Sequence, residues 1–64
     1  MIQAYERYRL LDRRLAMPVR RYENGVKQMV WLCQVTNTNC PPPMLTQTYN
    51  DVIPEQTLLQ AVKV

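Results

Sequence analysis

The residues of this chain that could do chemistry are few. Two cysteines, Cys33 and Cys40, offer thiols, and two carboxylates, Asp51 and Glu55, stand four positions apart, a spacing that places two side chains on one face of a helix. The chain has no histidine, so neither pair has the commonest general base beside it. An enzymatic hypothesis would rest on Cys33 or on the two carboxylates, but core packing explains the thiol and helix capping explains the carboxylates without any reaction. We therefore expect a non-enzymatic protein without catalytic residues or a small-molecule substrate.

Metal and cofactor sites lack their usual residues as well. Two cysteines without histidine cannot fill the four positions of a structural zinc site, and the single glycine, Gly25, is too little for a phosphate-binding loop. We expect no metal and no cofactor. For Cys33 and Cys40 two alternatives stay open: reduced thiols with Cys33 in the core, or a disulfide bridge. The absence of a secretory leader pattern favours the reduced thiols.

Arginine is the strongest chemical signal. Six of the eight basic residues are arginine, and residues 1–27 carry seven basic against three acidic residues, whereas residues 28–64 carry one against two. Four of these arginines would converge if the first segment folded back over the middle of the chain, and they are Arg13, Arg14, Arg20 and Arg21. With Tyr22 and Trp31 as stacking rings such a cluster could bind nucleic acid. No recognition-helix motif accompanies the charge, so a solvated face or an acidic protein partner is the favoured interpretation.

The elements that would position these residues begin with an amphipathic segment. Apolar residues recur every three or four positions through residues 1–16, which predicts a helix that Pro18 ends. A membrane-surface role for such a helix is weakened by Glu6 and Asp12. Packing against a core is the expected use of its apolar stripe.

A β-hairpin is predicted over residues 18–36. Asn24-Gly25 is a strong signal for a two-residue turn, which would set Glu23 opposite Val26. Along the second strand both faces are apolar in the middle, with Met29, Trp31, Cys33 and Val35 on one face and Val30 and Leu32 on the other. We expect either that helices cover both faces or that one face meets another molecule.

The remaining chain predicts an extended segment and a short helix. Pro41, Pro42 and Pro43 favour a rigid extended stretch within residues 37–50. Residues 51–64 carry a capping residue and an apolar stripe, which predict a short C-terminal helix. The predicted fold class is therefore α+β, in one domain over residues 1–64: helix, hairpin, extended segment, short helix.

A chain of 64 residues buries only about 60% of its unfolded surface, so a thin core needs support, and a partner chain is the supplement left once metals and bridges are set aside. The longest apolar run has five residues, too short to span a membrane. The sequence thus predicts a protein–protein interaction or structural subunit that docks on a larger protein or self-associates. An adaptor, assembly component or inhibitor from a virus or phage would fit, located in the cytoplasm or within a virion rather than secreted through a signal peptide. The candidate partner-binding anchors are Tyr22, Met29, Trp31, Leu32 and Leu45. The alternative is a small basic nucleic-acid-binding protein that uses the arginine cluster.

Overall fold

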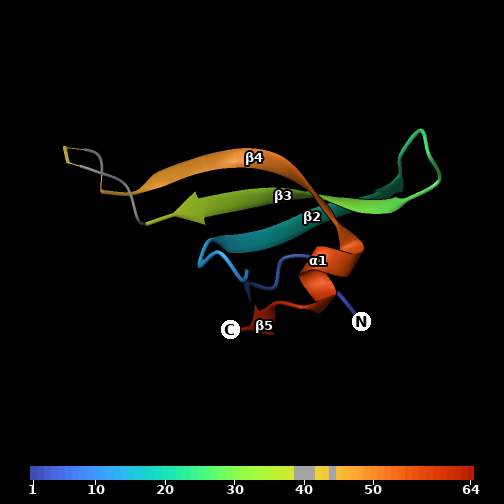
Figure 1. The fold of residues 1–64 in the computed structure, drawn as a ribbon, viewed down its shortest axis with the longest axis horizontal. Coiled ribbons are helices and arrows are strands. Elements are labelled where there is room, and N and C mark those ends of the chain that lie inside the picture. Colours follow the sequence, from blue (N-terminus) through green and yellow to red (C-terminus); the bar gives the residue numbers. More distant parts are fainter. Residues whose placement is uncertain (39–41, 44) are drawn as a thin grey trace.

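The computed structural model describes residues 1–38, 42–43 and 45–64, which form a five-stranded antiparallel sheet with one short helix (Figure 1). The elements are β1 (Tyr8–Arg9), β2 (Leu15–Glu23), β3 (Met29–Asn37), β4 (Gln47–Pro54), α1 (Glu55–Leu59) and β5 (Val62–Lys63). The strand order is β4-β3-β2-β1-β5. Strands β1 to β4 therefore pair as a meander, and β5 returns to lie beside β1. The predicted α+β class with two helices is wrong, because strands dominate the described residues.

The predicted helix over residues 1–16 is replaced by irregular chain, by β1 and by the first two residues of β2. Tyr5 and Arg13 have positive φ angles of 68° and 75°, which a right-handed helix cannot accommodate. The Tyr5 amide donates to the carbonyl of Pro18 (2.7 Å), and the Leu10 amide donates to the carbonyl of Arg14 (2.8 Å). The first hydrogen bond holds Tyr5 against β2, and the second closes the turn between β1 and β2.

The apolar residues of the predicted helix are nevertheless buried in part. Ile2, Tyr8 and Leu10 all belong to the core, and the Tyr8 hydroxyl accepts a hydrogen bond from the Gln3 amide (2.9 Å). Tyr8 faces Ala16 across the β1–β2 pair. Tyr5 and Leu11, which also belong to the spacing of three or four residues, are 69% and 77% exposed, so that spacing does not mark a buried face of this segment.

β2 and β3 pair antiparallel on either side of Asn24, but the predicted two-residue turn is wrong. Glu23 lies opposite Met29, not Val26. Lys27 donates to the carbonyl of Asn24 (3.0 Å) and takes the positive φ of 61°, so the connection is a three-residue loop that ends in a left-handed residue. The Asn24 side chain explains this choice, because its Oδ1 accepts from the amides of Val26 (3.0 Å) and Gln28 (2.9 Å).

The predicted C-terminal helix over residues 51–64 is also wrong. Residues 51–54 belong to β4, the helix is only α1, and Val62 returns to pair with Arg9. Pro54 precedes α1 in an extended conformation and closes the strand. Of the predicted extended segment over residues 37–50, the first residue belongs to β3 and residues 47–50 belong to β4. The predicted spacer at Pro41 to Pro43 falls partly outside the described residues.

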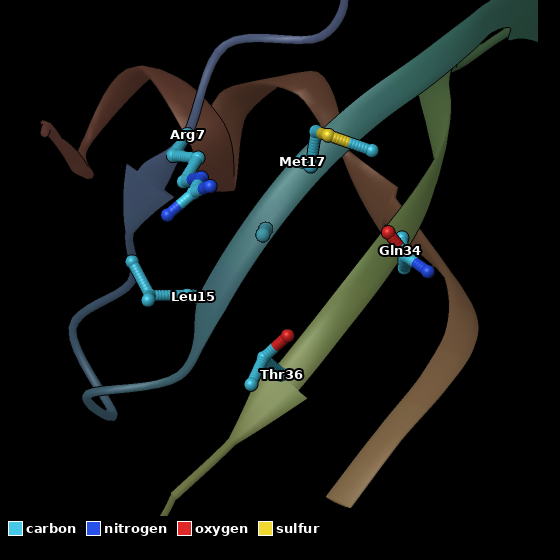
Figure 2. Close-up of a pocket in the computed structure, with 6 residues that line it drawn as sticks. Arg7, Leu15, Met17, Gln34 and Thr36 are labelled. Atoms are coloured by element: carbon cyan, nitrogen blue, oxygen red, sulfur yellow. The ribbon is translucent and has the colours of Figure 1, made fainter.

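The main buried cluster lies on one face of the sheet. α1 and the first residues of the chain cover this face, and Val35 lies opposite Ala16, as Trp31 does opposite Ile53. The buried cluster consists of Ile2, Tyr8, Leu10, Ala16, Trp31, Cys33, Val35, Ile53 and Leu58. The opposite face has no element packed over it among the described residues (Figures 1 and 2).

Candidate interaction surface

The side chains that alternate with the core residues form the uncovered side of the sheet, here called the open face. On each strand they are identified by the register of paired residues, which share a face. On the three long strands the open face consists of Leu15, Met17, Arg20 and Tyr22 of β2, Val30, Leu32, Gln34 and Thr36 of β3, and Thr48, Asn50, Val52 and Pro54 of β4.

A bulge in β2 decides which residues reach the open face. Pro18 lies opposite Cys33 on the core face, while Arg20 lies opposite Leu32 on the open face. Val19 is the extra residue between them. Pro18 and Arg20 are two positions apart and would share a face in a regular strand, but the bulge places them on opposite faces. Proline tolerates such a position because a bulge removes the need for its missing amide donor.

The middle of the open face is apolar. Leu32 and Val52 lie side by side with 36% and 44% of their surface exposed, and Tyr22 is 37% exposed. Val30 is only 3% exposed and lies between Tyr22 and Pro54 in the register. An antiparallel sheet with one solvated face normally carries polar residues there. This apolar band is the kind of surface that gains free energy when another molecule covers it.

A hollow of about 240 Å³ lies at the end of the open face beside β1 (Figure 2). Leu15 and Met17 of β2 form its apolar wall, Gln34 and Thr36 of β3 add an amide and a hydroxyl, and Arg7 reaches it from the segment before β1. The hollow therefore combines one cation, two aliphatic side chains and two polar groups that can donate or accept hydrogen bonds.

Charge is segregated between the two sides of the sheet. Arg20 lies on the open face of β2, and Arg9 lies opposite Leu15, which puts it on the same face. The strand carboxylates Glu23 and Asp51 lie opposite Met29 and Cys33, so they belong to the other face. Among the described strand residues the open face thus carries cations and no carboxylate.

The four arginines of the predicted cluster do not converge. Arg13 lies in the turn between β1 and β2, where its carbonyl accepts from Arg9 Nη1 (3.0 Å). Arg14 donates to Asp12 Oδ2 (2.7 Å) and to the Tyr49 hydroxyl (2.8 Å). The hydrogen bond to Tyr49 is the largest cause that raises the pKa of Arg14, and the backbone amide of Arg14 lowers the pKa of Asp12.

Arg20 and Arg21, although adjacent, point to opposite faces of the sheet. Arg21 pairs with Glu55 through two hydrogen bonds, Nε to Oε1 (2.8 Å) and Nη2 to Oε2 (3.1 Å). Trp31 Nε1 also donates to Glu55 Oε1 (3.1 Å). The Arg21 hydrogen bonds, followed by the one from Trp31, lower the pKa of Glu55. Only Arg20 of the predicted cluster is therefore presented on the open face.

The predicted anchors are divided in the same way. Tyr22 and Leu32 lie on the open face, whereas Trp31 belongs to the core. Met29 is half-buried on the core side, and Leu45 is exposed ahead of β4. Sequence reasoning missed four open-face residues at this site, namely Arg7, Leu15, Met17 and Val52. No apolar–polar alternation marks Met17 or Val52, because residues 15–19 and 52–54 are apolar throughout, and Arg7 comes close to Gln34 only through tertiary folding.

The residues considered for catalysis are not arranged for it. Cys33 is a free, fully buried thiol, as predicted for the core, and its Sγ donates to the Trp31 carbonyl (3.5 Å). Burial, with a smaller effect of the Asp51 charge, raises the pKa of Cys33 to about 11, so the thiol stays protonated and unreactive at neutral pH. Cys40 lies outside the described residues. Asp51 belongs to β4 and Glu55 opens α1, so they share no helix face.

Within residues 1–38, 42–43 and 45–64 no group of three metal-binding side chains comes together, and no helix there is long and apolar enough to cross a bilayer. No protein-family model, curated protein or solved structure matches the chain.

Proposed function

We propose that this protein is a non-enzymatic interaction or structural subunit that docks on a larger protein through its open face. The observation that supports this is the uncovered apolar band of Tyr22, Leu32 and Val52, opposite a face that holds the whole buried cluster. Covering the band would complete a second apolar layer for a chain that has little core of its own.

The size and shape of the molecule support the same proposal. Its accessible surface is 4778 Å², against about 4,300 Å² expected for a monomer of this mass. Its radius of gyration is 12.0 Å, against about 10.7 Å for a compact domain of this length. The excess comes from the long strands β2 to β4, which extend the molecule to 39 Å in one direction, past the part that α1 covers (Figure 1).

Self-association through the open face is less favoured than docking on a different protein. Two copies placed face to face would bring Arg9 and Arg20 of each into one contact without any carboxylate from that face. Like charges in a desolvated contact cost free energy. A different protein can supply the missing negative charge.

Site-specific photo-crosslinking in the native source tests the proposal. The photoreactive amino acid p-benzoylphenylalanine placed at Val52, on the open face, should give one discrete adduct with a larger protein. The same amino acid at Gln56, which is exposed on α1, is the matched control and should give none. No adduct at Val52 above the Gln56 level would refute the proposal, and an adduct of twice 7.6 kDa would replace it by self-association.

Binding of nucleic acid to the open face would overturn the proposal of a protein partner. Of the predicted elements only Arg20 and Tyr22 lie on the open face, while Trp31 is in the core, so the stacking platform is reduced to one ring. We expect no binding of a generic oligonucleotide at low salt. Affinity that falls steeply between two salt concentrations would show phosphate contacts instead. The viral or phage origin, and the location in a cytoplasm or virion, stay predictions.

A further inference from the structure

Three arginines at the open face, Arg7, Arg9 and Arg20, are in no ion pair among the described residues, and of these Arg9 donates to the Arg13 carbonyl (3.0 Å). Ion pairs in this part of the chain involve Arg14, with Asp12 and Asp51, and Arg21, with Glu55. Three of the five carboxylates, Asp12, Asp51 and Glu55, are therefore paired in the β1–β2 turn and on the core side, while the described strand residues of the open face carry no carboxylate.

Covering this face imposes a chemical requirement on the partner. An arginine that loses water without gaining a carboxylate or another acceptor is strongly unfavourable. Arg20 lies beside Leu32, in the apolar band itself, so a partner that buries the band also approaches the Arg20 guanidinium. A partner that places a carboxylate there gains a charge-assisted hydrogen bond in place of that penalty.

The hollow beside β1 makes the same requirement more specific. Its volume of about 240 Å³ corresponds to roughly eight water molecules, which is enough for one acidic side chain. The aliphatic stem of a glutamate would lie along Leu15 and Met17, and its carboxylate would meet Arg7, with Gln34 as a second donor (Figure 2). The hollow thus fits an acidic residue within a segment that also has apolar residues.

On these grounds, and resting on the proposed function, we propose that the segment that covers the open face is acidic and apolar in alternation. Its carboxylates pair with Arg7 in the hollow and with Arg20 beside the apolar band, and its apolar side chains lie on Leu32 and Val52. A single strand of nucleic acid offers negative charge but stacks best on aromatic rings, and the open face presents only Tyr22 for that purpose. The aliphatic composition of the face therefore favours a polypeptide.

The test uses a short peptide of alternating leucine and glutamate and a matched peptide of leucine and glutamine. Each is titrated at low salt into the full-length, isotope-labelled chain, and binding is followed by amide chemical shifts. The glutamate peptide should shift amides of β2, β3 and β4 and should bind about tenfold tighter than the glutamine peptide, as expected for a charge-assisted pair. Arg7→Gln and Arg20→Gln should each reduce this preference several-fold. Arg13→Gln removes the same charge from the turn and should leave the preference unchanged.

Several results would overturn the proposal. Equal binding of the two peptides, no binding of either at millimolar concentration, or an Arg13→Gln effect as large as that of Arg7→Gln would each refute an acidic partner. A thymidine oligonucleotide that displaces the glutamate peptide would assign the face to nucleic acid. If crosslinking at Val52 finds a partner while the two peptides bind equally, the docking face stands and only its acidic occupant is refuted. If crosslinking fails, the proposed function itself is refuted.

Discussion

Replacing Leu58 with alanine should remove much of the stability of this fold, whereas replacing Leu32 with threonine should barely change the stability of the isolated chain. Leu58 lies on α1, which covers the core face of the sheet, whereas Leu32 lies on β3 with its side chain on the open face. Leu58 is 1% exposed and belongs to the buried cluster. Leu32 lies on the open face, where more than a third of its surface meets solvent.

The expected magnitudes follow from this difference. A buried leucine replaced by alanine costs about 3–5 kcal/mol, because the lost contacts leave a cavity. A chain of this length has a total unfolding free energy of roughly 3–10 kcal/mol. α1 has only five residues and cannot persist without the contacts of Leu58, so Leu58→Ala should leave the protein close to unfolding. Leu32→Thr keeps a strand-favouring residue at an exposed position and should cost less than about 1 kcal/mol.

Urea unfolding measures both effects. Trp31 is the only tryptophan and lies in the core, so its fluorescence reports the loss of the buried cluster, and far-ultraviolet circular dichroism reports the sheet. Similar losses for the two variants, or a larger loss for Leu32→Thr, would refute the division into a core face and an open face. Leu32→Thr should, however, weaken the binding of a partner to the open face, although it barely changes the stability of the free chain.

Substitutions at three other positions test particular contacts. The raised pKa of Cys33, about 11 instead of 9.0, means that the buried thiol stays protonated, so stability should be full below pH 9.0 and fall by up to about 3 kcal/mol toward pH 11. Cys33→Ala should remove this alkaline loss in urea unfolding, and an unchanged slope would contradict it. The lowered pKa of Glu55 implies a contribution to stability that is complete above the ordinary carboxyl pKa of 4.5 and is lost as the pH falls below that value. Glu55→Gln should therefore lower the melting temperature at neutral pH and flatten the acid side of the plot of melting temperature against pH. An unaltered plot would argue against the pairing of Glu55 with Arg21. Asn24→Ala removes the acceptor of two amide hydrogen bonds and should cost about 1 kcal/mol in the same unfolding assay, whereas Asn24→Asp, which keeps the acceptor, should cost less; equal losses would show that the side chain does not hold the loop.

The two faces of β3 could be predicted from the sequence. Alternation along a strand is a local property, so the row of Trp31, Cys33 and Val35 was assigned to one face by spacing alone, and all three are buried there. The second apolar face, with Leu32, was predicted to need either a helix or another molecule over it. Among the described residues the structure covers one face and leaves the other open, so helices over both faces are ruled out there, while a molecule on the open face stays a prediction.

The first segment could not be predicted in the same way. β1 has only two residues and owes its conformation to β2 and β5 on either side. Such pairing is absent from any local window of sequence. The positive φ angles of Tyr5 and Arg13 are equally invisible, because neither residue type is typical of that conformation. Arg7 was consequently assigned to a helix, and its place in the hollow with Gln34 could not be inferred.

The bulge at Val19 could not be predicted from the sequence either, and it determines which arginine lies on the open face. With strict alternation along β2, Pro18 and Arg20 would share the core face, and Arg21 would lie on the open face, away from Glu55. The extra residue reverses the order from Arg20 onward, so Arg21 comes to pair with Glu55 on the core side while Arg20 stays beside Leu32 on the open face. One inserted residue thus determines that Arg21 is neutralised by Glu55 within the chain and that Arg20 stays on the open face. In the proposed function, Arg20 is then available to an acidic partner beside the apolar band.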